Sequence, residues 1–173
     1  SMPTQGHRPS EIIDREMKSG TKFVNGDTLM ARITPCLENG KTAFVDFLST
    51  DEEVAWGSTE YIVLRPRPPL PEEFGYFLAR DEDVRQHAIK NMTGSSGRQR
   101  VQVDCFDSYQ IAVPNEPVAS AFADFVKPLM AKIKAASNES STLSTLRDTL
   151  LPKLLSGELP VPAALTAIEE ALA

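Results

Sequence analysis

The sequence predicts an α+β fold, in which a mixed, twisted sheet with small helices is followed by one long helix. Up to about Pro114, turn residues separate short runs that are rich in β-branched and aromatic side chains. After Pro117 the chain is poor in glycine, and its apolar residues recur at steps of three and four. These patterns predict a globular domain at 1–116, a long helix at 117–157 and a tail at 158–173.

Alternating and β-rich runs predict the strands of the sheet. In the run at 28–33, Arg32 lies on the face opposite the apolar one, so we expect its side chain to project away from the core. Asn39-Gly40 then favours a tight hairpin turn, because both residues tolerate positive φ angles. The predicted strands span residues 28–33, 41–47, 61–64, 101–103 and 109–113.

Two short helices are predicted between the strand at 61–64 and the glycine-rich segment at 93–97. Pro71-Glu72-Glu73 is a typical helix start, since proline has a suitable φ and carboxylates favour the positive end of the helix dipole. Asp81 or Asp83 is expected to cap a second helix, which runs to about Met92. The buried stripe expected on the first helix consists of Phe74, Phe77 and Leu78.

The region after Pro117 predicts one helix over 118–155, roughly 55 Å long at 1.5 Å per residue. One small domain cannot cover an apolar stripe of that length, so we expect a partner helix, as in a coiled coil. Pro128 predicts a bend and Pro152 a disturbed end, while the polar stretch 137–141 offers a helical hairpin as the alternative. Ser156-Gly157 is the expected terminus. The predicted interface residues are Phe122, Phe125, Leu129, Ile133, Leu143, Leu146, Leu150 and Leu154.

Charge and hydropathy restrict the possible functions. The net charge of −6 and the pI near 5.0 argue against a nonspecific nucleic-acid binder, which is normally basic. Residues 84–103 nevertheless contain four basic side chains and no Asp or Glu, so any DNA surface must be local. The sequence has neither an apolar run of about 20 residues nor a signal peptide, and we expect a cytoplasmic protein without membrane contact.

Catalysis and metal binding are not expected. Cys36 and Cys105 are predicted to be free thiols, and neither forms a metal-ligand spacing with His7 or His87. A cysteine nucleophile paired with His87 is conceivable, but no third, orienting group accompanies it. The acidic pairs lie at predicted helix starts, where capping explains them. We therefore expect a protein that is not an enzyme and needs no metal and no cofactor.

The segment 93–100 has the chemistry of a DNA contact. Its glycines let backbone N–H groups approach phosphate, while arginine can pair with guanine O6/N7 and glutamine with adenine N6/N7. The alternative is an ordinary glycine turn with solvated arginines. The candidate contacts in this segment are Thr93, Gly94, Ser95, Ser96, Gly97, Arg98, Gln99 and Arg100.

Three further candidates, Arg32, Thr34 and Lys41, bracket the first predicted hairpin. For Arg32 a structural ion pair with Glu38 or Glu60 is an equal alternative to DNA contact. Ser58, Thr59 and Glu60 are expected to hold the fold together. Trp56 is expected to pack within the domain and not to stack on DNA.

Four segments together resemble the specificity subunits of type I restriction-modification systems. They are GDTLMARITPCLENGK at 26–41, WGSTEYIVLRP at 56–66, GSSGRQRV at 94–101 and LRDTLLPKLLSGEL at 146–159. A single glycine-rich loop would be a weak signal, whereas four segments in the same order are specific. The resemblance covers nearly the whole chain.

The resemblance implies a target-recognition domain followed by a spacer helix. In that family two recognition domains each read one half of a split double-stranded DNA target, and two long helices pack antiparallel between them. The subunit assembles with modification (methyltransferase) and restriction (translocase and endonuclease) subunits and has no catalysis of its own. With one domain and one helix, this chain would be either a half-subunit that associates with itself or a fragment of a longer subunit. The competing hypothesis is a protein assembly module without direct DNA binding, which the acidic balance favours.

Overall fold

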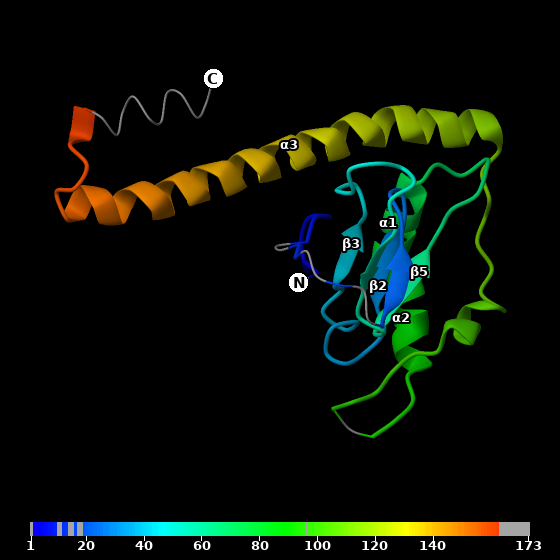
Figure 1. The fold of residues 1–173 in the computed structure, drawn as a ribbon. Helices are drawn as coiled ribbons and strands as arrows, with labels where there is room; N and C mark the ends of the chain where they lie inside the picture. The colour runs from blue at the N-terminus through cyan, green and yellow to red at the C-terminus, as the bar shows by residue number, and fades with distance from the viewer. Residues whose placement is uncertain (1, 10–11, 14–15, 17–18, 96, 163–173) are drawn as a thin grey trace. The chain divides into compact units, whose positions relative to one another are not determined.

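The computed structural model describes residues 2–9, 12, 13, 16, 19–95 and 97–162 (Figure 1). The chain divides into two compact units, Ser1–Met130 and Ala131–Ala173, and helix α3 contributes residues to both. The strands are β1 (Thr21–Phe23), β2 (Thr28–Ala31), β3 (Thr42–Phe44), β4 (Ala55–Gly57) and β5 (Tyr61–Leu64). The helices are α1 (Glu73–Arg80), α2 (Glu82–Lys90), the 3-10 helix η1 (Val103–Phe106) and α3 (Glu116–Leu155).

A three-stranded antiparallel sheet, in the order β3-β2-β5, forms the centre of the first unit. Within the central strand β2, Leu29 lies opposite Ala43 of β3 on one side and Val63 of β5 on the other. The turn before β2 depends on Gly26, whose φ of 85° is in the left-handed region. The strand predicted at 61–64 is confirmed in full, whereas those predicted at 28–33 and 41–47 form only over 28–31 and 42–44.

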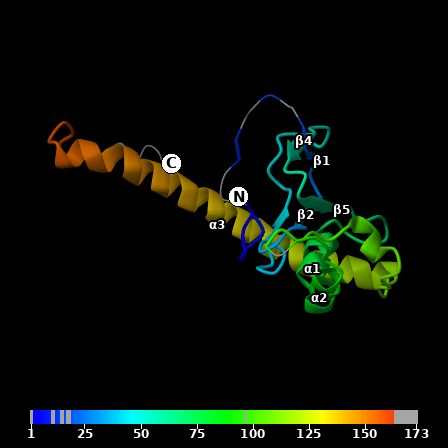
Figure 2. The same ribbon diagram turned by 90° about the horizontal axis from the view of Figure 1, so that it is seen from below.

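Both faces of β2 are buried. On one face, Leu29 and Ala31 pack in a cluster with Phe23 of β1. On the other face, Met30 packs in a second cluster with residues of α1 and α2. Figure 2 shows β1 and β4 on one side of this sheet and α1 and α2 on the other. The prediction that the face of Arg32 points away from the core is therefore wrong, because Met30 shares that face and the two helices cover it.

The pair β1–β4 is an element that the sequence patterns do not predict. The two strands are antiparallel, with Phe23 opposite Ala55 and Thr21 opposite Gly57. A Cβ atom at Gly20 would lie only 1.9 Å from the carbonyl oxygen of Gly57, so glycine is required for this close backbone approach. Strands of three residues are too short to give a recognisable alternation.

Helix α2 begins as predicted. The side chain of Asp81 accepts hydrogen bonds from the backbone N–H groups of Asp83 and Val84, which confirms it as the cap. The helix ends at Lys90, two residues before the predicted end at Met92.

The buried face predicted for α1, at 74–78, is wrong in part. Tyr76 and Ala79 are the aromatic and aliphatic residues that α1 buries, whereas Phe77 keeps 43% of its surface exposed. Phe74 and Phe77 instead meet the ring of Phe122 in α3, at centroid distances of 6.1 and 5.4 Å. The sequence pattern could not distinguish the sheet from α3 as the partner of this helix.

The strands predicted at 101–103 and 109–113 do not form. Val101 is fully buried and donates a hydrogen bond to the carbonyl of Arg32, but the chain then turns into η1. Ile111 and Val113 keep 38% and 59% of their surfaces exposed. A β-rich run becomes a strand only when a neighbouring strand pairs with it, and residue types alone cannot specify that neighbour.

Helix α3 is continuous over 40 residues. It passes Pro128 without a break, and the helical hairpin considered at 137–141 does not form. The disturbed end expected near Pro152 stays a prediction; the helix continues past this residue and ends at Leu155. Gly157, with a φ of 73°, follows the end of the helix as predicted, and its N–H donates to the carbonyl of Leu154. The Ala-rich part of the predicted tail, 163–173, lies outside the described residues.

The first part of α3 packs against the globular unit. Its buried residues Ala119, Ala123, Val126 and Met130 follow one another at steps of four, three and four. Met130 lies in a cluster with Phe44 of β3 and Tyr76 of α1. Within the described ranges, no helix combines the length and the apolar character needed to cross a membrane.

An ion pair between a buried carboxylate and an exposed guanidinium joins the start of β2 to the end of β5. Asp27, immediately before β2, has no exposed surface, and its two carboxylate oxygens accept hydrogen bonds from Arg65 Nε and Nη2 at 2.6 and 2.7 Å. The same carboxylate accepts the backbone N–H of Val24 at 2.8 Å. Arg65 follows β5, so this bidentate pair holds the β1–β2 turn against the end of β5.

We predict that Asp27→Asn lowers the free energy of unfolding by about 2–3 kcal/mol, because the amide cannot accept both guanidinium hydrogen bonds at a fully buried position. Asp124→Asn, at an exposed position of α3, is the matched control and should change stability by less than about 0.5 kcal/mol. Urea unfolding followed by circular dichroism measures both. Equal midpoints for the two variants would contradict the structural role of this pair.

Candidate nucleic-acid interface

Three separate segments of the sequence meet at one end of the central sheet. Because β3 and β5 both run antiparallel to β2, their first residues lie beside the last residues of β2. The backbone N–H of Arg32 donates to the carbonyl of Glu60 at 3.1 Å. On the next segment, the N–H of Val101 donates to the carbonyl of Arg32 at 2.9 Å, and that of Thr34 donates to the carbonyl of Gln99 at 3.0 Å. Thr34 Oγ1 in turn accepts the N–H of Gln99 at 3.1 Å.

The segment 93–100 folds back on itself as a hairpin-like loop after α2. The N–H of Thr93 donates to the carbonyl of Arg100 at 2.9 Å, and the N–H of Arg100 donates to the carbonyl of Thr93 at 2.8 Å. Gly94 and Gly97 have φ angles of 120° and 78°, which strain any other residue. In Figure 1 the loop follows α2 at the end away from α1.

The tip of this loop is exposed. Ser95 and Gly97 are both exposed, and Ser96 lies outside the described residues. The side chain of Arg98 is also exposed and makes no hydrogen bond or ion pair within the described part of the chain. The loop therefore offers backbone N–H groups, a hydroxyl and one unengaged guanidinium to solvent.

Arg100, by contrast, is held by a carboxylate. Its Nε lies 2.8 and 2.9 Å from the two carboxylate oxygens of Glu60, and its Nη2 lies 2.8 Å from Oε1. Its Nη1 makes only a long contact, 3.5 Å, to the carbonyl oxygen of Arg98. The Arg100 side chain remains 43% exposed and that of Glu60 26% exposed. Glu60, a predicted alternative partner of Arg32, thus forms its ion pair with Arg100 instead.

Arg32 is engaged by an amide. Its Nη2 donates to Oε1 of Gln102, while its Nε is buried and has no hydrogen-bond partner. Arg32 and Arg100 therefore lie on neighbouring segments, and their backbones are joined through Ile33, which forms a β-bridge with Arg100. Two side-chain pairs, Arg32 with Gln102 and Arg100 with Glu60, thus lie on these neighbouring segments.

Lys41 lies at the same end of the sheet but on its other side. It precedes β3, and its carbonyl accepts the N–H of Ala31 at 3.0 Å. Since β3 and β5 flank β2 on opposite sides, Lys41 is separated from Glu60 by the width of β2. The structure thus places Arg32, Thr34, Gln99 and Arg100 on two paired backbone segments, here called the arginine cluster, and leaves Lys41 at its margin.

The distribution of charge along α2 separates acidic from basic surface. Asp81, Glu82 and Asp83 lie at the start of this helix, whereas the arginine-containing loop follows its end. Helix α2 has nine residues, so at a rise of 1.5 Å per residue its two ends lie roughly 13 Å apart. These three acidic groups therefore lie at the opposite end of α2 from the arginine-containing loop.

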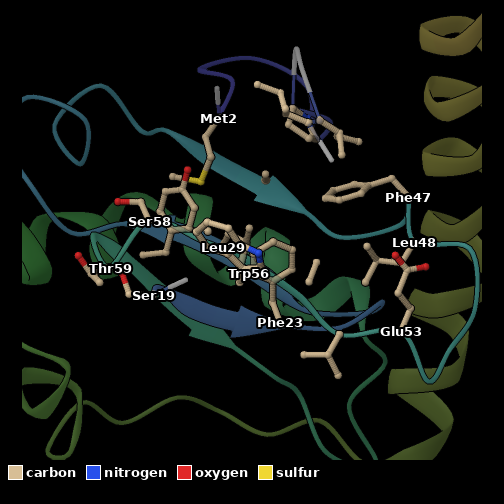
Figure 3. Close-up of a pocket in the computed structure, with 18 residues that line it drawn as sticks. Met2, Ser19, Phe23, Leu29, Phe47, Leu48, Glu53, Trp56, Ser58 and Thr59 are labelled. Atoms are coloured by element: carbon tan, nitrogen blue, oxygen red, sulfur yellow. The ribbon is translucent and has the colours of Figure 1, made fainter. Parts of the chain in front are cut away.

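One cavity, of about 680 Å³, is lined by residues of all five strands and of the adjoining loops (Figure 3). Phe23, Phe47 and Trp56 are among its aromatic lining residues; Trp56 is half-buried, and its expected packing within the domain stays a prediction. In Figure 3, Ser58 and Thr59, which lead to Glu60, lie at the opposite end from Glu53. The described lining mixes polar and apolar groups.

His87 and Cys105, which were considered as a catalytic pair, make packing and backbone contacts. His87 Nε2 lies 2.8 Å from the carbonyl oxygen of Cys105, not from its thiol. Burial raises the pKa of the Cys105 thiol, and the nearby Asp104 and Asp107 raise it further, so the reactive thiolate is disfavoured. The ring of His87 packs against Tyr109 at a centroid distance of 4.7 Å.

The apolar stripe predicted on α3 divides into two parts. Phe122 is half-buried between Phe74 and Phe77, so it belongs to the core of the globular unit. Phe125 is 70% exposed, and Leu129, Ile133 and Leu143 are 44–46% exposed. Leu146, Leu150 and Leu154 are partly exposed.

Comparison with known proteins identifies relatives of one kind. No protein-family profile matches the chain. The specificity subunit of the type I restriction enzyme EcoEI from Escherichia coli is 30% identical over 143 residues, which cover 82% of this chain and 24% of the relative. The specificity subunit of the type I restriction enzyme EcoAI, also from Escherichia coli, is 33% identical over 102 residues, 58% of this chain and 17% of the relative.

The chain thus spans about a quarter or less of the length of these relatives. The matches agree with the resemblance that four ordered sequence segments indicate. The chain belongs to the family of type I restriction enzyme specificity subunits.

Proposed function

We propose that this chain reads one half of a bipartite double-stranded DNA target as the non-catalytic specificity component of a type I restriction-modification system. The observation that carries the proposal is the cluster of Arg32, Thr34, Gln99 and Arg100, which come from two distant segments of the sequence. Arginine and glutamine are the side chains that distinguish guanine and adenine in the major groove. The kinship with specificity subunits supports the same conclusion.

We assign phosphate contacts and base contacts to different residues of this region. The exposed loop 93–100 suits phosphate, because Gly94 and Gly97 leave the backbone N–H groups accessible and Arg98 is unengaged. Arg100 and Gln99 lie closer to the sheet, where their backbones are hydrogen-bonded and their positions are defined. Base discrimination needs such defined positions, so we assign it to these residues, with Arg32, Thr34 and Lys41 at the flank.

The long helix is proposed to pack antiparallel against a second helix of the same kind. Beyond Phe122, which packs in the globular unit, Leu129, Ala136, Leu143 and Leu150 follow one another at intervals of seven residues along the continuous helix. A strict seven-residue repeat favours a left-handed supercoil with a partner, because each residue returns to the same seam. The partner helix is a second copy if the chain acts as a half-subunit, or a later segment if the chain is part of a longer subunit.

The modification and restriction subunits are the proposed protein partners of the assembly. The recognition unit reads DNA, the paired helices set the distance between two half-targets, and the partner subunits perform the chemistry. This division agrees with the placement of Cys105 and His87, which serve packing in this chain.

The second candidate function is a protein assembly module without DNA binding. The net charge of −6 and the exposed apolar residues of α3 favour it. The two functions differ in salt dependence, because a protein that neutralises several phosphates loses affinity steeply as the salt concentration rises. An assembly module would show no such salt-dependent affinity for DNA.

We predict that Arg98→Ala weakens binding to all DNA sequences by a similar factor and lowers the salt slope by about 1, because one phosphate contact is lost. Stability should stay unchanged, since the side chain is exposed and unengaged. Fluorescence anisotropy with a target chosen from random duplexes, in the presence of the modification subunit, measures the loss. Arg67→Ala, at another exposed arginine, is the control. Equal affinities for the two variants would remove the loop from the interface.

We predict that Leu143→Asp combined with Leu150→Asp abolishes self-association of this chain, because two carboxylates would be placed in an apolar seam. Sedimentation equilibrium measures the oligomeric state. Thr145→Asp is the matched control, since it adds the same charge about 200° around the helix from Leu143. A dimer that survives the double substitution rules out this seam as the interface.

A further inference from the structure

We infer that Glu60 is a positioning residue that orients Arg100 to read one guanine. The inference rests on the proposed DNA-reading function and adds a residue that itself touches no base. Its basis is the way in which the carboxylate occupies one edge of the guanidinium and leaves another edge available.

The guanidinium group has two edges that can each bind a planar pair of acceptors. The edge formed by Nε and Nη2 is occupied, because both nitrogens lie 2.8–2.9 Å from carboxylate oxygens of Glu60. Among the described residues, the end formed by Nη1 and Nη2 has only the 3.5 Å contact to the carbonyl of Arg98. Five N–H donors in a fixed fork allow one carboxylate and one further acceptor pair to bind at the same time.

The remaining end matches the hydrogen-bonding edge of guanine. Guanine presents O6 and N7 as two adjacent acceptors in the major groove, and arginine donates to both. A phosphate could also accept from the same donors, but it does not require a fixed orientation. A guanidinium held in one plane by a carboxylate is pre-organised for the base, because less side-chain freedom is lost on binding.

The backbone of Glu60 is held as firmly as its side chain. Glu60 directly precedes β5, and its carbonyl accepts the N–H of Arg32 at the end of β2. Arg100 is anchored from the other side by the paired hydrogen bonds with Thr93 and by the bridge to Ile33. The carboxylate and the guanidinium are therefore both attached to the sheet, and their relative orientation is set by strand pairing.

The charge of Glu60 has a second consequence. A carboxylate beside the guanidinium reduces its attraction for any phosphate, so Glu60 lowers nonspecific affinity while it favours the base contact. Removal of the carboxylate should therefore affect specific and nonspecific binding in opposite directions. A role in folding alone would weaken both together.

The test is selection of bound sequences from random duplexes by the full chain with the modification subunit. Wild type, Glu60→Ala, Glu60→Gln and Arg100→Ala are compared, with the exposed Glu38→Gln as the control for loss of a charge. We expect Glu60→Ala and Arg100→Ala to lose preference for guanine at the same single position, by about 5- to 100-fold, and to keep the other positions. Glu60→Gln, which can still accept one hydrogen bond, should lose less.

The double variant Glu60→Ala with Arg100→Ala completes the test. If Glu60 acts through Arg100, the double variant discriminates bases no worse than Arg100→Ala alone. Nonspecific affinity of Glu60→Ala should rise, with a steeper salt dependence. A uniform loss across all positions, or unchanged guanine preference in Glu60→Ala, would overturn the inference while the DNA-reading function stands. Absence of any selected sequence with wild type would overturn both.

Discussion

The antiparallel pairing of β2 with both of its neighbours is the constraint on which the candidate interface depends. It brings the first residues of β3 and β5 to the last residue of β2, so Lys41, Glu60 and Arg32 reach the same end of the sheet. The segment 99–101 then pairs with the continuation of β2 and adds Arg100. Without this pairing the arginines would lie on unrelated loops. The ion pair between the buried Asp27 and the exposed Arg65 secures the other end of β2 and β5.

Burial of both faces of β2 explains why the interface lies at an end of the sheet and not on a face. One face of the sheet packs beneath β1 and β4 and the other beneath α1 and α2. Only the strand ends and the loops that continue them remain accessible. A site built there combines the stiffness of the sheet with the exposure of a loop, a combination that sequence recognition requires. Helix α3 is also expected to need a partner, because no residue of the described chain buries its exposed leucines.

Local signals predicted much of this structure because their causes are local. Asp81 caps α2 and Gly157 follows the end of α3, since each depends on a few residues that are close in the sequence. Predictions that depended on a distant partner were less accurate. Residues 109–113 have the composition of a strand and no pairing, whereas β1 and β4 pair without a clear alternation. For α1, the pattern found an amphipathic helix but not which neighbour covers Phe77.

The sequence by itself determined the α+β class, the long helix, the family and the residue types capable of reading DNA. These follow from periodicity, turn chemistry and segment order, which are properties of the chain read in one dimension. Only the tertiary structure decided which of those residues act together, and it paired Arg100 with Glu60 while Arg32 went to Gln102. Such pairs join residues 40 and 70 positions apart, and their choice depends on strand register. A shift of one residue in register would turn each side chain to the other face, and no local pattern specifies that choice.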